Sequence, residues 1–307
     1  MAGLILNVPY GSPFLPRAVQ KRLTITEEET RWENWRLTDP FLLELVKQAM
    51  EPALPTVSPS LRRVDSDSDR PSHWPSFRLV SYSFSPLVAD PLGTLAKELG
   101  QLDKPGPCIL TKGSLEKDLP NWTPAEREFI FSHCARPYLE QLSQAATELL
   151  AAESMVLLLN IRFFATKSWR RDHKELPKPQ INLGFDDQLT PMGLVHLAGH
   201  VFRRFGLWAE MDYPLVGVDA PAALAQHPRL KALGLAIRRD LYLDEATAKL
   251  KTSAESLVRL LRTFFGLLGQ ELDRVVQARV RRAYPPKPPS SVIKANKTGQ
   301  IVGKKSQ

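Results

Sequence analysis

The sequence predicts an α/β fold, a single three-layer α/β/α domain around a mixed, mostly parallel sheet. Short apolar runs typical of buried strands alternate along the chain with longer runs of helical periodicity, and this alternation indicates a sheet covered by helices on both faces. The chain has 307 residues, of which 43% are hydrophobic and 24% charged, so it can bury a large core beneath an ordinary surface.

Strands are expected where short apolar runs are bounded by turn residues. The clearest is 154–160, where five successive apolar residues are followed at once by a polar one. The first run ends in the loop 7–16, NVPYGSPFLP, and a loop at the carboxyl end of a strand is where open α/β sheets usually bind ligands. The expected strands lie at 4–6, 77–84, 154–160, 180–185, 208–212 and 233–243.

Capping residues mark the starts of the expected helices. Asp39 precedes Pro40, a proline suited to the first helical turn, and Thr123 with Glu126 forms a capping box. The helix that follows this box contains Pro137, where we expect a kink. The expected helices lie at 40–50, 124–152 and 191–205, with a last one from a cap at 252–255 into 274–284.

The chain is expected to divide into an α/β domain at 1–284 and a tail at 285–307. The tail is rich in proline and lysine and has few apolar residues, so we expect it to be disordered. The net charge is +8, but the five lysines of 287–307 leave only +3 for the rest of the chain. Within the domain, 51–76 has little periodicity and is expected to form a long loop or a lid.

No secretion signal or membrane span is visible. The N-terminus has no basic flank before a long apolar run, and no stretch approaches about 18 uninterrupted apolar residues. A cytoplasmic location is therefore expected. The two cysteines, Cys108 and Cys134, form no CxxC pair, so they cannot build a zinc ribbon and are expected to be reduced structural thiols.

The sequence HLAGH places His196 and His200 one helical turn apart, as in zinc proteases. Leu197 stands where such a protease has its general-base glutamate. Arg203 and Arg204 lie on the same face of the expected helix as the histidines, where they would oppose a divalent cation. We therefore expect a solvated polar face here.

Other motifs of known chemistry are lacking. The sequence has no GxGxxG, Walker A or GxSxG motif, so nucleotide binding and serine hydrolysis have no support. The acidic run at 63–70 lacks the glycine and the final glutamate of a calcium loop, and is expected to be a solvated charged loop.

Seven short motifs nevertheless follow one another in a recognisable order. They are PYGS at 9–12, TD at 38–39, SPLVAD at 85–90, LLLNIRF at 157–163, INLG at 181–184, YPLVG at 213–217 and RRDLYLD at 238–244. Over about residues 4–250 this order resembles the N-formylglutamate amidohydrolase family. The resemblance implies a zinc-carboxypeptidase-like, or phosphorylase/hydrolase-like, domain and a metal-dependent amidohydrolase.

The motif positions that agree with the family are mainly glycines, prolines and apolar residues. At the positions that the family's chemistry uses, this chain has Tyr10 and Arg162 in place of two histidines, Asn160 in place of an acid and Ala236 in place of a glutamate. The resemblance thus implies an altered pocket of Tyr10, Asp39, Asp90, Asn160, Arg162 and Ala236. A catalytic zinc needs about three lone-pair donors, and arginine offers none. We predict a pseudoenzyme that has lost zinc and activity and serves as a binding or regulatory module.

The expected partner is an anionic small molecule or protein. Arg162, Arg238 and Arg239 could present guanidinium groups to a carboxylate or phosphate, or could equally be salt-bridged structural residues. A pair between Asp39 and Arg162 is the specific expectation for the pocket.

Two alternatives remain open. One is an active amidohydrolase on N-acyl amino acids, with zinc held by His196, His200 and Glu210. The other is an interaction protein whose basic C-terminal region binds nucleic acid, non-specifically, or an acidic partner.

Overall fold

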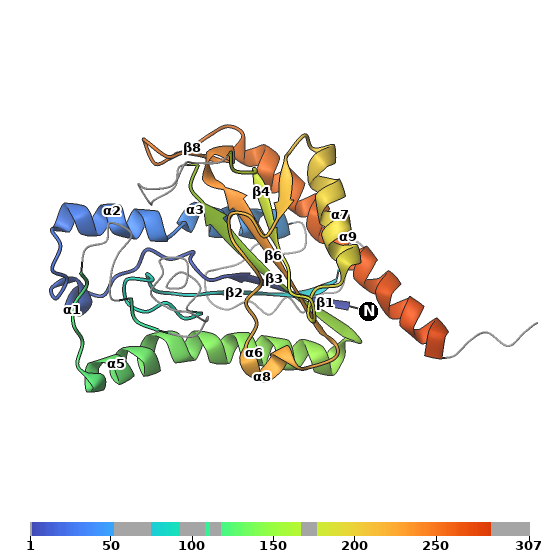
Figure 1. Cartoon of the computed structure of the whole chain (residues 1–307), viewed down its shortest axis with the longest axis horizontal. Helices are drawn as coiled ribbons and strands as arrows, with labels where there is room; N and C mark the ends of the chain where they lie inside the picture. The colour runs from blue at the N-terminus through green and yellow to red at the C-terminus, as the bar shows by residue number, and fades with distance from the viewer. Residues whose placement is uncertain (1, 52–74, 93–107, 111–117, 167–176, 284–307) are drawn as a thin grey trace, which may run out of the picture.

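A six-stranded sheet forms the centre of the computed structural model (Figure 1). Its strand order is β2-β1-β3-β6-β4-β5, with β1, β2, β3 and β6 parallel, β4 antiparallel to β6, and β5 parallel to β4. The expected mixed, mostly parallel sheet is confirmed. The strands are β1 (Ala2–Val8), β2 (Ser76–Ser81), β3 (Met155–Phe164), β4 (Ile181–Gly184), β5 (Ala209–Met211) and β6 (Leu230–Arg238). The structure describes residues 2–51, 75–92, 108–110, 118–166 and 177–283.

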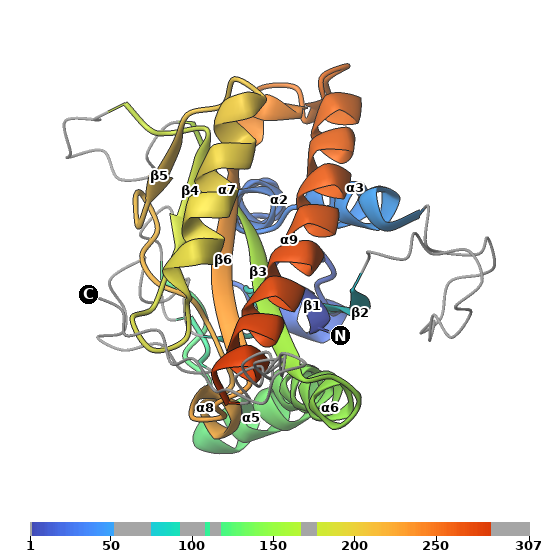
Figure 2. The same cartoon turned by 90° about the vertical axis from the view of Figure 1, so that its right-hand side faces the viewer.

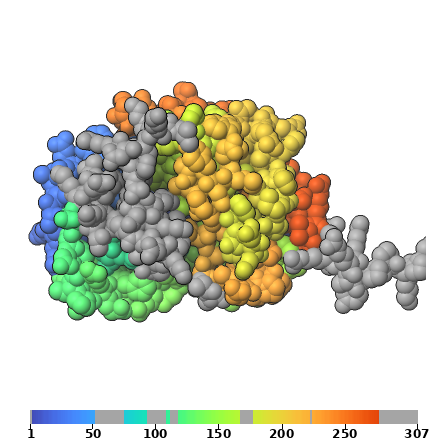
Figure 3. Space-filling view, in the orientation of Figure 1, coloured from blue at the N-terminus to red at the C-terminus, as the bar shows by residue number. Residues whose placement is uncertain are grey.

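Helices on both faces of the sheet complete three layers (Figures 1 and 2). One layer contains α5 and α6, with the short α8, and the other contains α3, α7 and α9, with α2 beside α3. Figure 3 shows α5 and α6 at the surface along the lower edge and α7 at the upper right. The helices are α1 (Arg17–Gln20), α2 (Glu27–Leu37), α3 (Pro40–Met50), α5 (Pro124–Ile130), α6 (Arg136–Ala152), α7 (Met192–Arg204), α8 (Ala222–Ala225) and α9 (Ala254–Ala283).

Strand β3 is buried along its whole length, as its apolar sequence predicts. Leu157 and Phe163 belong to the core beneath α3 and α9, whereas Leu158 belongs to the core beneath α6. Because side chains alternate along a strand, Asn160 and Arg162 face the α6 side of the sheet. Because of this alternation, a charged side chain of β3 can meet only charged groups on its own face of the sheet.

The structure replaces the kink expected at Pro137 with a wider turn just before it. Residues Phe131–Ala135 form a single π-helical turn between α5 and α6. Proline lacks an N–H and its ring collides with the carbonyl four residues earlier, here that of His133. Widening the turn that contains this carbonyl lets the helix continue.

Helix α2 was not predicted, although its start carries a clear signal. Thr26 and Glu29 form a capping box, of the same kind as the predicted box of Thr123 and Glu126. The helix sequence, EEETRWENWRL, is charged or polar on most faces, so the apolar periodicity on which helix prediction depends is weak.

The strand expected over 233–243 ends early, at Arg238. A 3-10 turn, η4 (Arg239–Leu241), follows, and then β7 (Leu243–Asp244) pairs with β8 (Lys249–Leu250). The early end allows Arg239 to leave the sheet and reach a buried carboxylate, as described below.

Three expected segments lie wholly or mainly outside the described residues: the loop or lid at 51–76, the acidic run at 63–70 and the tail at 285–307. In the described part of the chain, no helix combines the length and the apolar character needed to cross a membrane.

Candidate functional site

The strand order places the topological switch point of the sheet between β1 and β3, and the region at the carboxyl ends of these two strands is here called the crevice. The chain passes from β1 to β2 on one side, and then returns to the other side of β1 to form β3. Connections therefore diverge at the carboxyl ends of these two strands, which is where open α/β sheets bind ligands. Tyr10 follows β1, and Arg162 lies near the end of β3.

Five side chains meet at this crevice. The Tyr10 hydroxyl donates a hydrogen bond to Asp90 Oδ1 at 3.1 Å, and the guanidinium carbon of Arg162 lies 5.6 Å from the centre of the Tyr10 ring. Arg162 Nη1 lies 3.9 Å from Asp219 Oδ2. Ala236 is the direct neighbour of Arg162 on β6. The predicted residues Tyr10, Asp90, Arg162 and Ala236 thus come together, and Asp219 is an addition that the sequence did not indicate.

Asp90 is held by its backbone as well as by Tyr10. Its N–H and C=O both pair with Cys108, at 2.8 and 3.0 Å. Burial, with a smaller contribution from the Asp90 charge, raises the pKa of the Cys108 thiol to about 12, and burial also raises the pKa of Cys134. Both cysteines are free thiols, and their raised pKa values make them poor nucleophiles.

Asn160 belongs to a buried chain of hydrogen bonds that begins on α6. The Tyr138 hydroxyl donates to Asn7 Oδ1 at 2.7 Å, and Asn7 Nδ2 donates to Asn160 Oδ1 at 2.8 Å. Asn160 Nδ2 then donates to the backbone carbonyl of Asp219. Burial raises the pKa of Tyr138, so its hydroxyl remains a donor. Both polar groups of the Asn160 amide are used within the protein.

Residues 212–221, here called the strap, carry Asp219, and Val218 and Ala220 of the strap pack against the core beneath α6. Asp212 Oδ1 accepts hydrogen bonds from the N–H groups of Phe185 and Gly217, which close the first turn of the strap. A Cβ atom placed on Gly184 would lie 2.1 Å from the carbonyl oxygen of Gly217, so the strap and β4 touch directly.

One buried asparagine of β4 anchors the strap. Asn182 accepts from the Tyr213 N–H at 2.7 Å and donates to the Leu215 carbonyl at 2.9 Å. The strap residues themselves are half-buried, except for Val216, which is exposed. In Figure 3 this part of the chain lies at the surface between α7 and α8.

Asp39 does not pair with Arg162 as predicted. It lies on the other side of the sheet, where it caps α3 through Leu42 N at 2.9 Å and accepts from Arg239 Nε at 3.1 Å and the Tyr242 hydroxyl at 2.5 Å. Burial, and then the Asp39 charge, raise the pKa of Tyr242. We call Asp39, Arg239 and Tyr242 the clasp.

The Arg239 guanidinium has further partners that complete the clasp. It donates to the backbone carbonyls of Trp35 and Thr38. Its central carbon lies 4.0 Å from the centre of the Phe163 ring. Phe163 faces the α9 side, whereas the adjacent Arg162 faces the α6 side, and this alternation is why the predicted pair of Asp39 and Arg162 cannot form.

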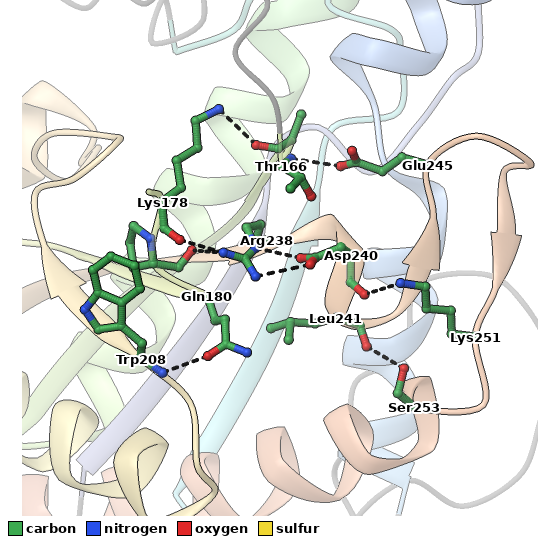
Figure 4. A network of polar contacts seen from close by, with 12 residues as sticks. Thr166, Lys178, Gln180, Trp208, Arg238, Asp240, Leu241, Glu245, Lys251 and Ser253 are labelled. Atoms are coloured by element: carbon green, nitrogen blue, oxygen red, sulfur yellow. Dashed lines mark hydrogen bonds and ion pairs between the residues drawn. The ribbon is translucent and has the colours of Figure 1, made fainter. Parts of the chain in front are cut away.

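Arg238 is also engaged within the protein (Figure 4). It binds the Asp240 carboxylate through Nε at 2.7 Å and Nη2 at 3.1 Å, and its Nη1 donates to the carbonyls of Lys178 and Pro179. Of the three arginines predicted to bind an anion, Arg238 and Arg239 therefore fit the structural alternative. Arg162 is the one located at the crevice.

His196 and His200 are exposed on α7, as expected for a solvated face. Glu210 lies on β5, where its Oε1 accepts a hydrogen bond from Trp208 Nε1 at 2.6 Å. Within the described residues, no three His, Cys, Asp or Glu side chains gather closely enough to hold a metal ion. The alternative ligand set of His196, His200 and Glu210 is therefore not assembled.

The residues at the predicted pocket do not fit a catalytic zinc. Arg162 has no lone pair to donate, and Ala236 has no polar side-chain atom. Both carboxylate oxygens of Asp39 are bound within the protein, and the Asn160 amide is bound at both ends. A zinc site needs about three side chains with available lone pairs, and these positions do not provide them.

The protein is thus a three-layer α/β protein with a mixed sheet, and charged side chains lie at the switch point of that sheet. Residues 2–243 match the family model of N-formylglutamate amidohydrolase. The chain belongs to the N-formylglutamate amidohydrolase family, in agreement with the resemblance of its motifs.

Solved structures give the same fold. The chain is similar to an N-formylglutamate amidohydrolase from Ralstonia eutropha JMP134, with a TM-score of 0.64 and 19% identity over 88% of this chain and 94% of that one. It is also similar to a gene product of Agrobacterium tumefaciens, with a TM-score of 0.61 and 16% identity over 89% and 91% of the two chains. A comparison with curated proteins found no match.

Proposed function

We propose that this chain is a non-catalytic member of the family that binds a small anion through Arg162. The observation that carries the proposal is the position of this guanidinium, at the switch point of the sheet and beside Tyr10. Arginine suits carboxylates and phosphates because its planar donors match two acceptor oxygens at once. A permanently charged arginine binds an anion but cannot activate a water molecule as a zinc ion does.

The absence of catalysis is inferred from the chemistry of the residues that replace the family's ligands. Tyr10, Arg162 and Ala236 supply a hydrogen-bond donor, a cation and a methyl group at one place. The remaining carboxylate there, Asp90, accepts from the Tyr10 hydroxyl. Hydrolysis needs a general base that takes a proton from a water molecule beside a group that polarises the amide. We infer that these four residues do not form such a set.

The two alternatives have less support. An active site at His196, His200 and Glu210 would need three side chains that do not converge. Nucleic-acid binding by the C-terminal region stays a prediction, because the tail at 285–307 lies outside the described residues.

Isothermal titration tests the proposed binding. We expect N-formyl-L-glutamate or inorganic phosphate to bind the wild-type protein, and Arg162→Met to lose that binding. Arg204→Ala is the matched control, since it removes the same charge from the exposed end of α7 and should bind like the wild type. Binding that survives Arg162→Met would show that the anion lies elsewhere.

The loss of activity needs two further measurements on the full chain. We expect zinc far below one atom per chain by elemental mass spectrometry after dialysis, and no release of formate from N-formyl-L-glutamate. One tightly held zinc per chain together with formate release would overturn the proposal of a non-catalytic protein.

A further inference from the structure

We propose that Asp219 is a built-in competitor at the anion site, and that a small carboxylate binds Arg162 by replacing it and displacing the strap. This inference rests on the proposed function, because it concerns the same guanidinium. It adds the chemical class of the ligand and a means of regulating its binding.

The balance of charge at Arg162 limits which ligands can bind there. The side chains of Arg162 and Asp219 are only 9% and 10% exposed, and their opposite charges cancel. An anion added beside them would leave an extra negative charge in a poorly solvated place, which is costly unless it is compensated. The Asp90 carboxylate, which accepts from the Tyr10 hydroxyl, lies at the same crevice. An incoming anion must therefore take the place of the Asp219 carboxylate.

The existing pair of Arg162 and Asp219 has poor geometry. Its closest nitrogen and oxygen atoms are 3.9 Å apart, whereas charge-assisted hydrogen bonds between such groups are about 2.7–2.9 Å long. The Asp219 backbone carbonyl accepts from Asn160, so the protein fixes the position from which this carboxylate reaches the guanidinium. A free carboxylate has no such restraint and can adopt the bidentate geometry.

The backbone and contacts of the strap favour its movement. Hydrogen bonds to Asn182 hold its first half, its residues are half-buried, and Val218 and Ala220 are its apolar contacts with the core beneath α6. Two strap residues, Asp212 and Gly217, have left-handed backbone angles, with φ of 49° and 78°. Such turns at the start and middle of a surface segment are suited to absorb a change of direction.

The charge of the crevice favours a carboxylate over a phosphate. A single carboxylate replaces the Asp219 carboxylate charge for charge. A phosphate carries up to about two charges near neutral pH and would add one beside Asp90. Glutarate is the probe of choice: each of its two carboxylates carries a single charge, three methylene groups separate them so that only one needs to approach Arg162, and it has no formamide group.

The test compares glutarate binding by wild type, Asp219→Asn, Asp187→Asn and Arg162→Met in isothermal titration. Asp219→Asn keeps the backbone carbonyl that Asn160 uses and removes the competing charge, so we expect a dissociation constant roughly tenfold lower than that of the wild type. Asp187 is an exposed acid before α7, and its change to asparagine is the matched control that should leave the affinity unchanged.

Hydrogen exchange of the wild-type protein provides a readout that needs no variant. We expect saturating glutarate to increase exchange across 212–221, because the Gly217 and Tyr213 N–H groups lose their partners when the strap moves. Slower or unchanged exchange there on binding would contradict displacement of the strap.

The possible failures are distinguishable. If the wild type binds glutarate and Arg162→Met does not, but Asp219→Asn binds no more tightly, then Asp219 is not a competitor and the proposed function stands. If neither the wild type nor Asp219→Asn binds glutarate or phosphate, the proposed function itself is overturned, and this inference with it.

Discussion

The clasp of Asp39 and Arg239 and the pair of Asp219 and Arg162 lie on opposite faces of one sheet, near the same edge. In the clasp the side chains are 0% and 3% exposed and the ions are 3.1 Å apart, with Tyr242 and Leu42 N as further donors to the carboxylate. In the crevice the side chains are slightly more exposed and the ions are 3.9 Å apart.

The difference shows how a protein can use the same two residue types for opposite purposes. A buried ion pair stabilises a fold only when its geometry is good and its remaining hydrogen-bonding groups are satisfied. The clasp meets this condition and joins α3 to the end of β6. The crevice pair, at 3.9 Å, lacks this close geometry, which agrees with the proposed exchange of partners at Arg162.

The largest effect is expected from breaking the clasp. Arg239→Ala would leave the Asp39 carboxylate buried without its cation, and should lower the free energy of unfolding by about 3–5 kcal/mol. Urea unfolding followed by circular dichroism measures this, with Arg204→Ala expected to stay within about 0.5 kcal/mol of wild type. A loss below about 1 kcal/mol would mean that the clasp and the crevice pair are equivalent.

A smaller effect is expected where the strap touches the sheet. Gly184→Ala places a methyl group against the Gly217 carbonyl, so either the strap or β4 must shift, at a cost of about 1–3 kcal/mol. We also expect faster hydrogen exchange over 212–221 in this variant. Wild-type stability and exchange would show that the strap adjusts freely and is not closely fitted to β4.

The clasp should also weaken in alkali. The pKa of Tyr242 is raised in the folded protein, whereas an unfolded tyrosine ionises near pH 10. Its contribution to stability is therefore complete below about pH 10 and is lost above it, at about 1.4 kcal/mol for each pH unit.

Tyr242→Phe isolates this contribution from the other titrating groups. Above about pH 10, the unfolding free energy of the wild type should fall more steeply than that of Tyr242→Phe. Parallel curves between about pH 9 and 11 would contradict a protonated Tyr242 in the folded state.

The smallest effect is expected at the crevice. Arg162→Met replaces the guanidinium with an apolar side chain, and the strap can turn the Asp219 carboxylate towards water. We expect a change in unfolding free energy of less than about 1 kcal/mol in either direction. A loss as large as that of Arg239→Ala would make the crevice pair a structural element like the clasp.

Much of the fold could be predicted because its signals are local. The buried run of β3, the Asp39 cap and the box of Thr123 and Glu126 all appear in the structure as expected. Helix α2 was missed because its surface is charged on most sides. The reversal of β4 and β5 depends on which strands pair, and no local pattern in the sequence determines that.

The site was predicted less completely, for two physical reasons. Motif order indicated Tyr10, Asp90 and Arg162, but the partner of Arg162 comes from the strap, far away in the sequence. The pairing of Asp39 was wrong because Arg162 and Phe163 point to opposite sides of β3, and only the structure shows on which side Asp39 lies. Asn7 could have been found, as a polar residue inside an apolar strand.

The buried chain of hydrogen bonds has a direction. Tyr138 donates to Asn7, Asn7 donates to Asn160, and Asn160 donates to the carbonyl of Asp219. The bond dipoles therefore point in the same direction along the chain and polarise one another. The proposed displacement of the strap would withdraw that carbonyl, so that the last donor would lose its acceptor and the series would weaken back to α6. Such a change would reach α6, the layer on the same side of the sheet, through two amides and a phenol.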